Sequence, residues 1–191
     1  MFKKKEDSKT IIAIVGKTSS GKDTISKHIV EKYNIPFVVS YTTRPKRDYE
    51  TNGKEHYFIS AKKMAKLIKN KSDLMAYTKN AQTGIEYCAT KSSIKGDKAL
   101  YIINPDGVDW LKQNCPDVKV VAIYIALEEE DIIKRGIARG DNESTLRTRL
   151  ASEREEFDEY RRSGKWNYVV DSSKRLDMVL ADVDMIMSEV L

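Results

Sequence analysis

The stretch "IIAIVGKTSSGKDT", residues 11–24, decides the fold, because an apolar run passes through a glycine-rich turn into a helical segment. The run Ile11 to Val15 is apolar throughout, and such a run predicts a buried strand. Gly16, Gly21 and Lys22 then fit the pattern G-x-x-x-x-G-K-[ST]. In that pattern the backbone N–H groups and the helix dipole face the phosphates of a nucleotide. The sequence therefore predicts a nucleotide-binding loop.

The loop departs from the pattern at one residue. Asp23 stands where the hydroxyl is usual, and Thr24 follows one place late. A carboxylate beside polyphosphate is repelled unless a cation lies between them, and Mg²⁺ accepts both carboxylate and hydroxyl oxygens. We therefore expect Asp23, Thr24 or both to hold Mg²⁺, directly or through water, and Lys22 to reach the β- and γ-phosphates. The alternative is a Gly/Ser-rich turn that binds nothing.

Further strands and helices are predicted after the loop. A helix is predicted through about Tyr33, and later segments are predicted as strands at 37–41, 99–104, 118–126 and 168–170, with an amphipathic helix at 176–191. Continuous apolar strands that alternate with helices indicate a parallel sheet covered on both faces. The predicted fold class is α/β, with the three-layer core of a P-loop NTPase.

Two stretches interrupt the alternation. Residues 40–90 are polar and carry scattered strand and helix signals, so we interpret them as a small acceptor-binding insertion. Residues 128–163 are charged and helical, with a sparse apolar stripe of Leu146, Leu150 and Phe157. This pattern suits a helical lid, and a merely solvated helix fits it equally well. The core is then 9–39, 91–127 and 164–191, within one domain spanning 1–191.

Composition and charge restrict the classes of protein to which the chain can belong. The chain has 191 residues, of which 40% are hydrophobic and 33% charged, which is typical of one globular domain. The net charge of +5 suits an anionic ligand, although a solvated lysine-rich surface explains it more simply. Cys88 and Cys115 have neither metal-type spacing nor a disulfide framework. The charged start and the short first apolar run do not form a signal peptide or membrane span, so we expect a cytoplasmic protein.

Basic residues gather in two further places. The segment 40–58 holds Ser40, Arg44, Arg47 and His56, and arginines three apart can fork around one phosphate. By itself this would be a solvated loop; beside a nucleotide loop it predicts an acceptor phosphate pocket. The lid carries arginines that can neutralise a moving phosphoryl group, and among Arg135, Arg139, Arg147 and Arg149 we select all but Arg147.

These motifs together resemble the guanylate kinase family almost end to end. Five motifs occur in the order in which the family has them. They are the phosphate loop, "SYTTRPKR" (40–47), Glu50 with Gly53, Tyr87 with Thr90, and the R-x-x-x-R-G of 135–140. The resemblance implies ATP-dependent phosphorylation of GMP or dGMP. It assigns catalysis to Lys22, Arg44, Arg135 and Arg149. It assigns ATP binding to Gly16, Ser19, Ser20, Gly21, Lys22, Asp23, Thr24 and Arg139. It assigns acceptor binding to Ser40, Arg44, Arg47, His56, Tyr87 and Asn104.

The departures from the family lie in the base pocket. The family's guanine-reading glutamate falls at Ala76 and its serine near Ala89, with Glu86 as the alternative carboxylate. Its two aspartates of "D-x-D" fall at Ile102 and Asn104, and a phosphate-binding tyrosine falls at His56. Fewer buried polar groups mean weaker discrimination between bases. We therefore expect a poorer preference for guanine than the family norm.

Two other functions are also compatible with the sequence. Ribose 1,5-bisphosphate phosphokinase shares the Asp after the loop lysine, a His near 56 and an Asn near 104, but lacks the counterpart of Arg47. Guanylate kinase-like domains also occur as non-catalytic protein-binding modules, which usually lose the phosphate loop that Gly21 and Lys22 preserve here. The expected partners are ATP and a GMP-like nucleotide, without nucleic acid or membrane. Monomer and homo-oligomer are equally compatible with the sequence.

Overall fold

The computed structural model describes residues 9–48, 50–80 and 83–191. The chain divides into two compact units. Unit 1 comprises the described parts of Met1–Ile11, Pro36–Tyr101 and Gly107–Val120, and unit 2 comprises Ile12–Ile35, Ile102–Asp106 and Val121–Leu191.

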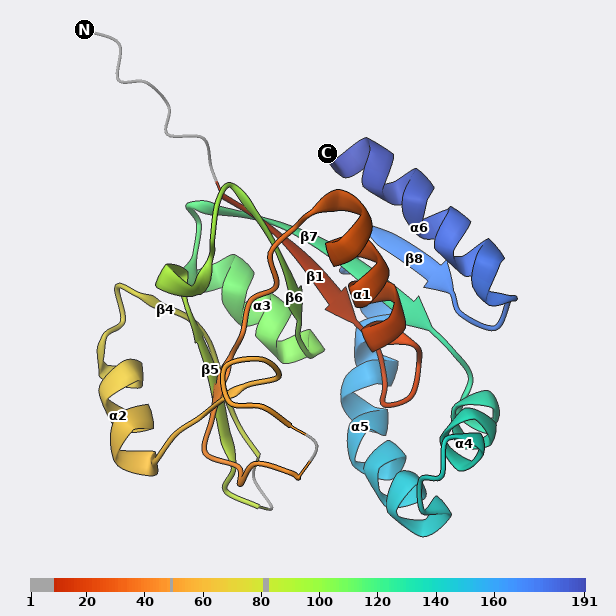
Figure 1. Ribbon diagram of the computed structural model, residues 1–191, viewed down its shortest axis with the longest axis horizontal. Helices are drawn as coiled ribbons and strands as arrows, with labels where there is room; N and C mark the ends of the chain where they lie inside the picture. The colour runs from red at the N-terminus through yellow and green to blue at the C-terminus, as the bar shows by residue number, and fades with distance from the viewer. Residues whose placement is uncertain (1–8, 49, 81–82) are drawn as a thin grey trace, which may run out of the picture. The chain divides into compact units, whose positions relative to one another are not determined.

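The first sheet has four strands, hydrogen-bonded in the order β6-β1-β7-β8 (Figure 1). They are β1 (Lys9–Val15), β6 (Lys98–Ile102), β7 (Val118–Ala126) and β8 (Tyr168–Asp171). Ile11 to Val15 of β1 are fully buried, and β7 and β8 run parallel with Ile123 opposite Tyr168. Strands buried on both faces need no polar alternation, so the apolar runs predicted them. The predicted α/β fold with a parallel sheet is confirmed.

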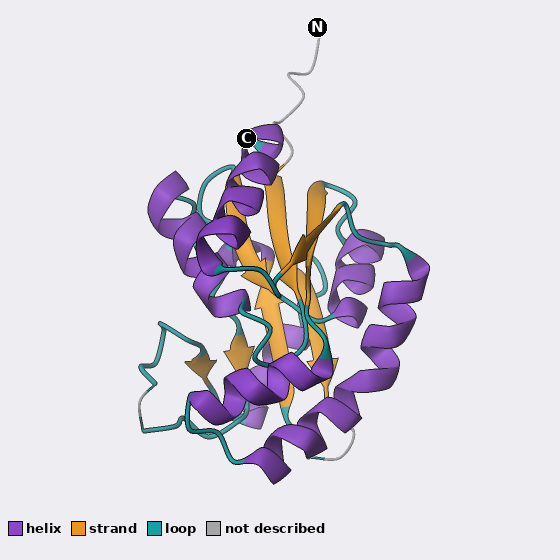
Figure 2. Ribbon diagram, turned by 90° about the vertical axis from the view of Figure 1, so that its right-hand side faces the viewer, coloured by secondary structure: helices purple, strands orange, loops and turns teal. Residues whose placement is uncertain are grey.

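Helices follow the strands in the predicted alternation. They are α1 (Lys22–Tyr33), α3 (Pro105–Asn114), α4 (Glu129–Ala138), α5 (Glu143–Ser163) and α6 (Leu176–Val190). Within unit 2, α1 packs against α6, and helices lie on both sides of the strands (Figure 2). The amphipathic prediction for the last helix is confirmed, because Val179, Val183 and Met187 form its buried stripe.

The predicted strand at 37–41 is wrong. Phe37 forms only an isolated parallel bridge with Leu100, and Val38 donates one hydrogen bond to the Leu100 carbonyl at 2.8 Å. Regular pairing resumes at β2 (Tyr41–Thr42), in a different sheet. The apolar residues of this segment are therefore divided between two sheets, which no local pattern distinguishes. The strand predicted at 99–104 ends at Ile102, since α3 begins at Pro105.

The second sheet belongs to unit 1 and has the order β3-β2-β5-β4. Beside β2 it contains β3 (Tyr57–Phe58), β4 (Leu74–Lys79) and β5 (Glu86–Thr90), and unit 1 also holds α2 (Ala61–Lys69) and the short 3-10 helix η1 (Lys91–Ser93). Met64 of α2 packs against Leu74 and Cys88 on one face of this sheet. Residues 40–90 therefore have a sheet and a small core of their own, more regular than their scattered sequence signals suggested.

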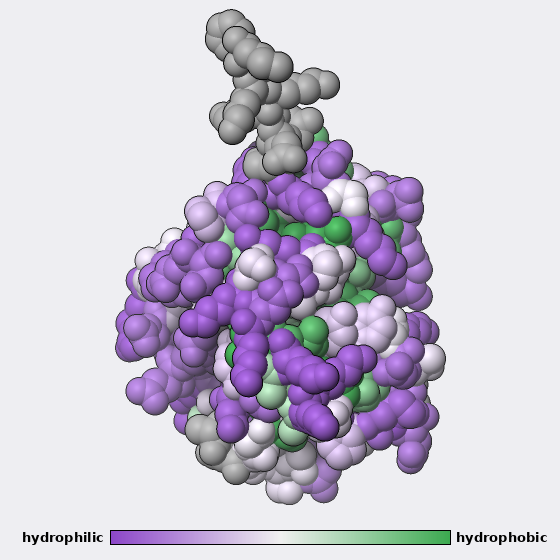
Figure 3. Space-filling model, turned by 90° about the vertical axis from the view of Figure 1, so that its left-hand side faces the viewer, coloured by the Kyte–Doolittle hydropathy of each residue, from purple (hydrophilic) through white to green (hydrophobic). Residues whose placement is uncertain are grey.

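The outer surface of α2 accounts for part of the basic charge. Its lysines, Lys62, Lys63, Lys66 and Lys69, are all exposed. Figure 3 shows a face of the molecule that is hydrophilic over most of its area. This agrees with the simpler explanation of the net charge, a solvated lysine-rich surface.

The charged segment 128–163 forms two helices joined by a tight turn. Asn142 caps α5 by accepting a hydrogen bond from the Thr145 N–H at 3.1 Å. Leu146 and Leu150 pack against Ile132 of α4, whereas Phe157 stacks on Tyr124 of β7, with ring centroids 6.5 Å apart. The apolar stripe therefore packs against two elements, α4 in its first half and β7 in its second half. Among the helices that the structure describes, none combines the length and the apolar composition that a membrane crossing requires.

Candidate active site

The predicted nucleotide-binding loop connects β1 to α1 by a sharply turned backbone. Gly16 has no room for a side chain, since a Cβ there would lie 2.7 Å from Ser20 Oγ and 3.0 Å from the Ile125 carbonyl oxygen. Ser19 and Gly21 adopt left-handed backbone conformations, with φ of 54° and 98°. No side chain caps the start of α1. Its first N–H groups are therefore available to an anion.

A cavity of about 210 Å³ opens in front of this loop. Its lining is rich in cations and consists of Ser19, Gly21, Lys22, Asp23, Thr24, Arg135 and Arg139. Seven of the predicted site residues therefore gather around one cavity. Gly16 and Ser20 lie outside this lining; the Ser20 hydroxyl is buried and has no hydrogen-bond partner among the described residues. The excess of positive charge makes the cavity suitable for a polyphosphate.

Lys22 is held within the loop itself. Its Nζ donates a hydrogen bond to the Lys17 carbonyl at 2.8 Å. Burial lowers the pKa of Lys22, while the carboxylates of Asp23 and Glu153 act in the opposite direction. A neutral carbonyl does not cancel the positive charge of the ammonium group. That charge is therefore available to a phosphate, which is a stronger acceptor.

The three selected arginines occupy different surroundings. Arg139 donates to Ser19 Oγ at 2.9 Å and pairs with Asp141. Arg135 donates to both the hydroxyl and the carbonyl of Ser172. Arg149 lies outside the cavity lining. It approaches Glu153, one helical turn further along α5, with 3.8 Å between the nearest nitrogen and oxygen.

Two residues around the loop were missed by sequence reasoning. Glu153 accepts a hydrogen bond from the Thr18 N–H at 2.9 Å, so one backbone N–H group of the loop is bonded to a carboxylate of the protein itself. Ser172 donates to the Ser20 carbonyl at 2.8 Å. The spacing of Arg149 and Glu153 could have indicated a helical ion pair. No sequence signal pointed to the loop contact of either residue.

The second residue of the loop joins it to α4 and α5. Lys17 Nζ lies 2.9 Å from Glu129 and 3.7 Å from Asp158. Glu129 also pairs with Arg154 at 2.7 Å, and hydrogen bonds from Arg154 and Lys17 lower the pKa of Glu129 to about 2. Part of the charge in the segment 128–163 is therefore used in contacts with the loop.

Asp23 and Thr24 satisfy the chemical requirement for a magnesium site. Both are exposed and line the cavity, and their oxygens are hard donors of the kind that Mg²⁺ prefers. Nowhere in residues 9–48, 50–80 and 83–191 do three or more His, Cys, Asp or Glu side chains gather as a metal site would need. The two oxygens fit an ion that takes its remaining ligands from phosphate and water.

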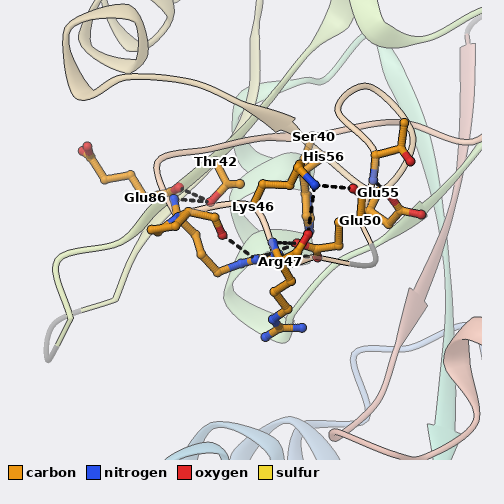
Figure 4. A network of polar contacts seen from close by, with 11 residues as sticks. Ser40, Thr42, Lys46, Arg47, Glu50, Glu55, His56 and Glu86 are labelled. Atoms are coloured by element: carbon orange, nitrogen blue, oxygen red, sulfur yellow. Dashed lines mark hydrogen bonds and ion pairs between the residues drawn. The ribbon is translucent and has the colours of Figure 1, made fainter.

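A second polar cluster lies in unit 1 around the carboxylate of Glu50 (Figure 4). Arg44 donates two hydrogen bonds to the Glu50 carboxylate, at 2.9 and 2.7 Å. The Arg47 backbone N–H donates to the same carboxylate at 2.8 Å, while the Arg47 side chain points away from it (Figure 4). The hydrogen bonds from Arg44 lower the pKa of the buried Glu50 to about 2. Glu50 thus fixes the guanidinium plane of Arg44.

Ser40, His56 and Tyr87 complete this cluster. Ser40 Oγ lies 2.9 Å from His56 Nδ1, and the His56 ring meets Tyr87 edge-on with centroids 5.7 Å apart. Burial lowers the pKa of His56, and the positive charge of Arg44 lowers it further, which favours the neutral imidazole. A hydrogen bond with Tyr87 contributes to the raised pKa of Arg44. The structure therefore brings Ser40, Arg44, His56 and Tyr87 together, as the sequence predicted.

The strand register divides the second sheet into two faces. Ala76 is opposite Ala89 and Thr78 is opposite Tyr87, so these four side chains lie on the same face of the sheet. Glu86 alternates to the other face, where its carboxylate accepts a hydrogen bond from the Tyr77 hydroxyl at 2.7 Å. The suggestion that Glu86 replaces the carboxylate missing at Ala76 is therefore wrong.

Asn104 belongs to unit 2 and has a carboxylate partner there. Its amide donates to Glu156 of α5 at 2.7 Å, and the Asp106 N–H donates to the same oxygen at 3.2 Å. Burial raises the pKa of Glu156. The role of Asn104 toward the acceptor stays a prediction.

A parallel sheet, a glycine-rich loop before α1 and a cationic cavity together define a P-loop phosphate-binding fold. The family model "Guanylate kinase" matches residues 7–190. The chain therefore belongs to the guanylate kinase family and is a nucleoside monophosphate kinase.

Individual relatives agree with this assignment. The chain is 32% identical over 177 residues to a guanylate kinase of Clostridium tetani, covering 88% of this chain and 81% of the relative. It is 30% identical over 181 residues to a guanylate kinase of Mycoplasmopsis synoviae, covering 89% and 88%. The crystal structure of guanylate kinase from Anaplasma phagocytophilum superposes with a TM-score of 0.60 at 20% identity, covering 94% of this chain and 82% of that one, which shows the same fold.

Proposed function

We propose that this protein transfers the γ-phosphoryl group of ATP to GMP or dGMP, forming GDP or dGDP. The observation that carries the proposal is the cavity in front of the phosphate loop, where Lys22, Arg135 and Arg139 converge. The names of the relatives reported above support guanosine monophosphate as acceptor, since they are guanylate kinases.

On the donor side, the loop N–H groups and Lys22 bind the β- and γ-phosphates. Arg135 and Arg139 offset the charge of the moving phosphoryl group, and we assign a similar task to Arg149. Phosphoryl transfer depends mainly on positioning and on charge stabilisation, which is what fixed cations supply. Asp23 and Thr24 hold Mg²⁺, which when bound offsets phosphate charge and orients the phosphate oxygens.

On the acceptor side, Arg44 binds the phosphate of the monophosphate together with Ser40, Arg47 and Tyr87. Glu50 keeps the Arg44 fork in one orientation before the acceptor arrives. His56 takes the place of a tyrosine in this pocket, and its neutral imidazole offers one donor and one acceptor. Pre-organised side chains lower the entropy lost on binding.

We further propose that residues 40–90 form the acceptor-binding insertion and 128–163 the lid of a single kinase domain, with 9–39, 91–127 and 164–191 as the core. The cytoplasm is the proposed location, and ATP and a GMP-like nucleotide are the proposed ligands. Monomer and homo-oligomer both remain compatible with this function.

A phosphoryl-transfer screen tests the proposal. ADP release is measured with Mg-ATP and each nucleoside monophosphate, and with ribose 1,5-bisphosphate, for the wild type and Lys22→Ala. We expect GMP and dGMP to be the best acceptors and Lys22→Ala to be nearly inactive. Phosphorylation of ribose 1,5-bisphosphate alone would assign the chain to the sugar-phosphate kinases. Absence of Mg-ATP binding would make it a non-catalytic module.

A further inference from the structure

Ser172 lies at the point where the first sheet, the phosphate loop and α4 meet within unit 2. It directly follows β8 and is 3% exposed. Its N–H donates to the Ala126 carbonyl at 2.9 Å, which extends the parallel pairing of β7 and β8 by one residue. The backbone that carries its side chain is therefore held by the sheet.

The Ser172 hydroxyl makes two hydrogen bonds of opposite direction. It donates its one proton to the Ser20 carbonyl at 2.8 Å and accepts from Arg135 Nη1 at 3.0 Å. A hydroxyl has one donor, so the bond from arginine, which can only donate, leaves that proton to the carbonyl. Arg135 Nη2 also donates to the Ser172 carbonyl. The guanidinium is thus bound at two points at the edge of the cavity.

The bond to Ser20 also determines the orientation of a loop N–H group. The carbonyl of Ser20 and the N–H of Gly21 belong to one peptide unit, and in a planar trans peptide they point in opposite directions. The described residues contain no cis peptide bond. Because the carbonyl is directed at Ser172, the Gly21 N–H is directed away from it. Gly21 lines the cavity and holds a φ of 98°, which a side-chain-bearing residue rarely adopts.

We infer that Ser172 is a positioning residue for phosphate binding, which acts through the Ser20–Gly21 peptide and through Arg135. It orients one backbone donor and one guanidinium toward the same anion. This inference rests on the proposed function, since it concerns the donor side of the same site. A merely structural serine that completes β8 would make the Ala126 contact and leave the nucleotide affinity unchanged.

Equilibrium binding of ADP, followed by calorimetry, tests the inference without the acceptor. We compare the wild type, Ser172→Ala, Arg135→Ala and the double variant, with Ser173→Ala as control, because Ser173 is exposed and bonds only within its turn to Asp171. Ser172→Ala should weaken ADP binding about tenfold, the effect of one misplaced charge-assisted hydrogen bond. The double variant should lose less than the product of the two single losses. Ser173→Ala should bind as the wild type does.

Kinetics and folding separate positioning from stability. Ser172→Ala should raise the KM for ATP and lower kcat, with the KM for GMP and the far-ultraviolet circular dichroism spectrum unchanged. If Ser172→Ala does not fold, Ser172→Cys, whose thiol is a weaker donor, replaces it with a smaller loss in the same direction. Unchanged ADP affinity, or losses that simply multiply in the double variant, would overturn the inference. Failure of the wild type to bind ADP would instead overturn the proposed function.

Discussion

The phosphate loop of unit 2 and the Arg44–Glu50 cluster of unit 1 are both suited to anions, but they are constructed differently. The loop is one contiguous segment, Gly16 to Thr24, that presents backbone N–H groups and a helix start. The cluster is assembled from side chains that lie far apart in the chain, from Ser40 to Tyr87. The backbone donors of the loop do not depend on the side chain at position 23, where Asp23 stands in place of a hydroxyl residue. A side-chain site depends on each member.

The two regions also differ in how their cations are balanced. Lys22 is bonded to a neutral carbonyl, whereas Arg44 is paired with a buried carboxylate. Lys22 therefore keeps its charge for the ligand, and the cluster uses part of its charge to hold one geometry. We therefore propose that Lys22 acts on the ligand mainly by charge and the Arg44–Glu50 cluster mainly by orientation.

The largest effect is expected from removing the charge of the loop. Lys22→Ala should reduce kcat by about a hundredfold or more, because the cation that stabilises the moving phosphoryl group is lost. The melting temperature should change little, since the Lys22 ammonium bonds only a loop carbonyl. Lys27→Ala, on the exposed side of α1, is the matched control. Near-full activity of Lys22→Ala would remove the loop from the mechanism.

The next effect concerns orientation in the cluster. Glu50→Gln should raise the KM for the acceptor about tenfold and leave the KM for ATP unchanged, because the Arg44 fork loses its ionic partner. Glu55→Gln, which alters the same loop away from Arg44, is the control. An unchanged acceptor KM would show that Glu50 does not orient Arg44.

The difference in stability between the wild type and Glu50→Gln should depend on pH. The pKa of Glu50 is lowered from 4.5 to about 2 in the folded protein, so its stabilising effect is fully present above about pH 4.5. That effect is lost as the pH falls toward 2. Thermal unfolding of the wild type and Glu50→Gln should therefore differ most above pH 4.5 and converge in acid. A difference that is constant with pH would exclude the ion pair as its cause.

An effect of similar size is expected from a variant that tests the base side of the cluster. Ala76→Glu should improve the preference for GMP over other monophosphates by roughly tenfold, because a carboxylate that accepts hydrogen bonds from guanine contributes about 1.5–3 kcal/mol. Glu86→Gln is the matched control, since its side chain lies on the other face of the sheet. Loss of selectivity in Glu86→Gln would contradict the assignment of faces.

The smallest effect is expected at the variable residue of the loop. Asp23→Ala should raise the Mg²⁺ concentration for half-maximal rate several-fold, with the rate at saturating Mg²⁺ largely kept. A titration of activity against Mg²⁺ measures this directly. Unchanged Mg²⁺ dependence would leave Asp23 only as a favourable charge at the start of α1.

The sequence by itself determined those features that are written in contiguous residues. The strand at 118–126, the loop with Lys22 and the closing helix all follow from local sequence, because a buried strand is a continuous apolar run, the loop has a fixed motif and an amphipathic helix has its own periodicity. Ser40 and Arg44 were proposed from the basic segment 40–58, whereas Tyr87 was added by the family resemblance, which relates separated motifs that local patterns do not connect.

The tertiary structure alone decided which side chains meet. Ser172 contacts Ser20 across 152 positions and Glu153 contacts Thr18 across 135, and no spacing rule connects residues so far apart. The register of β4 and β5 placed Glu86 on the face away from Ala76, because a shift of one residue moves a side chain to the other side of a sheet. The segment 37–41 failed as a strand for the same reason, since pairing partners distant in sequence determine where an apolar segment becomes a strand.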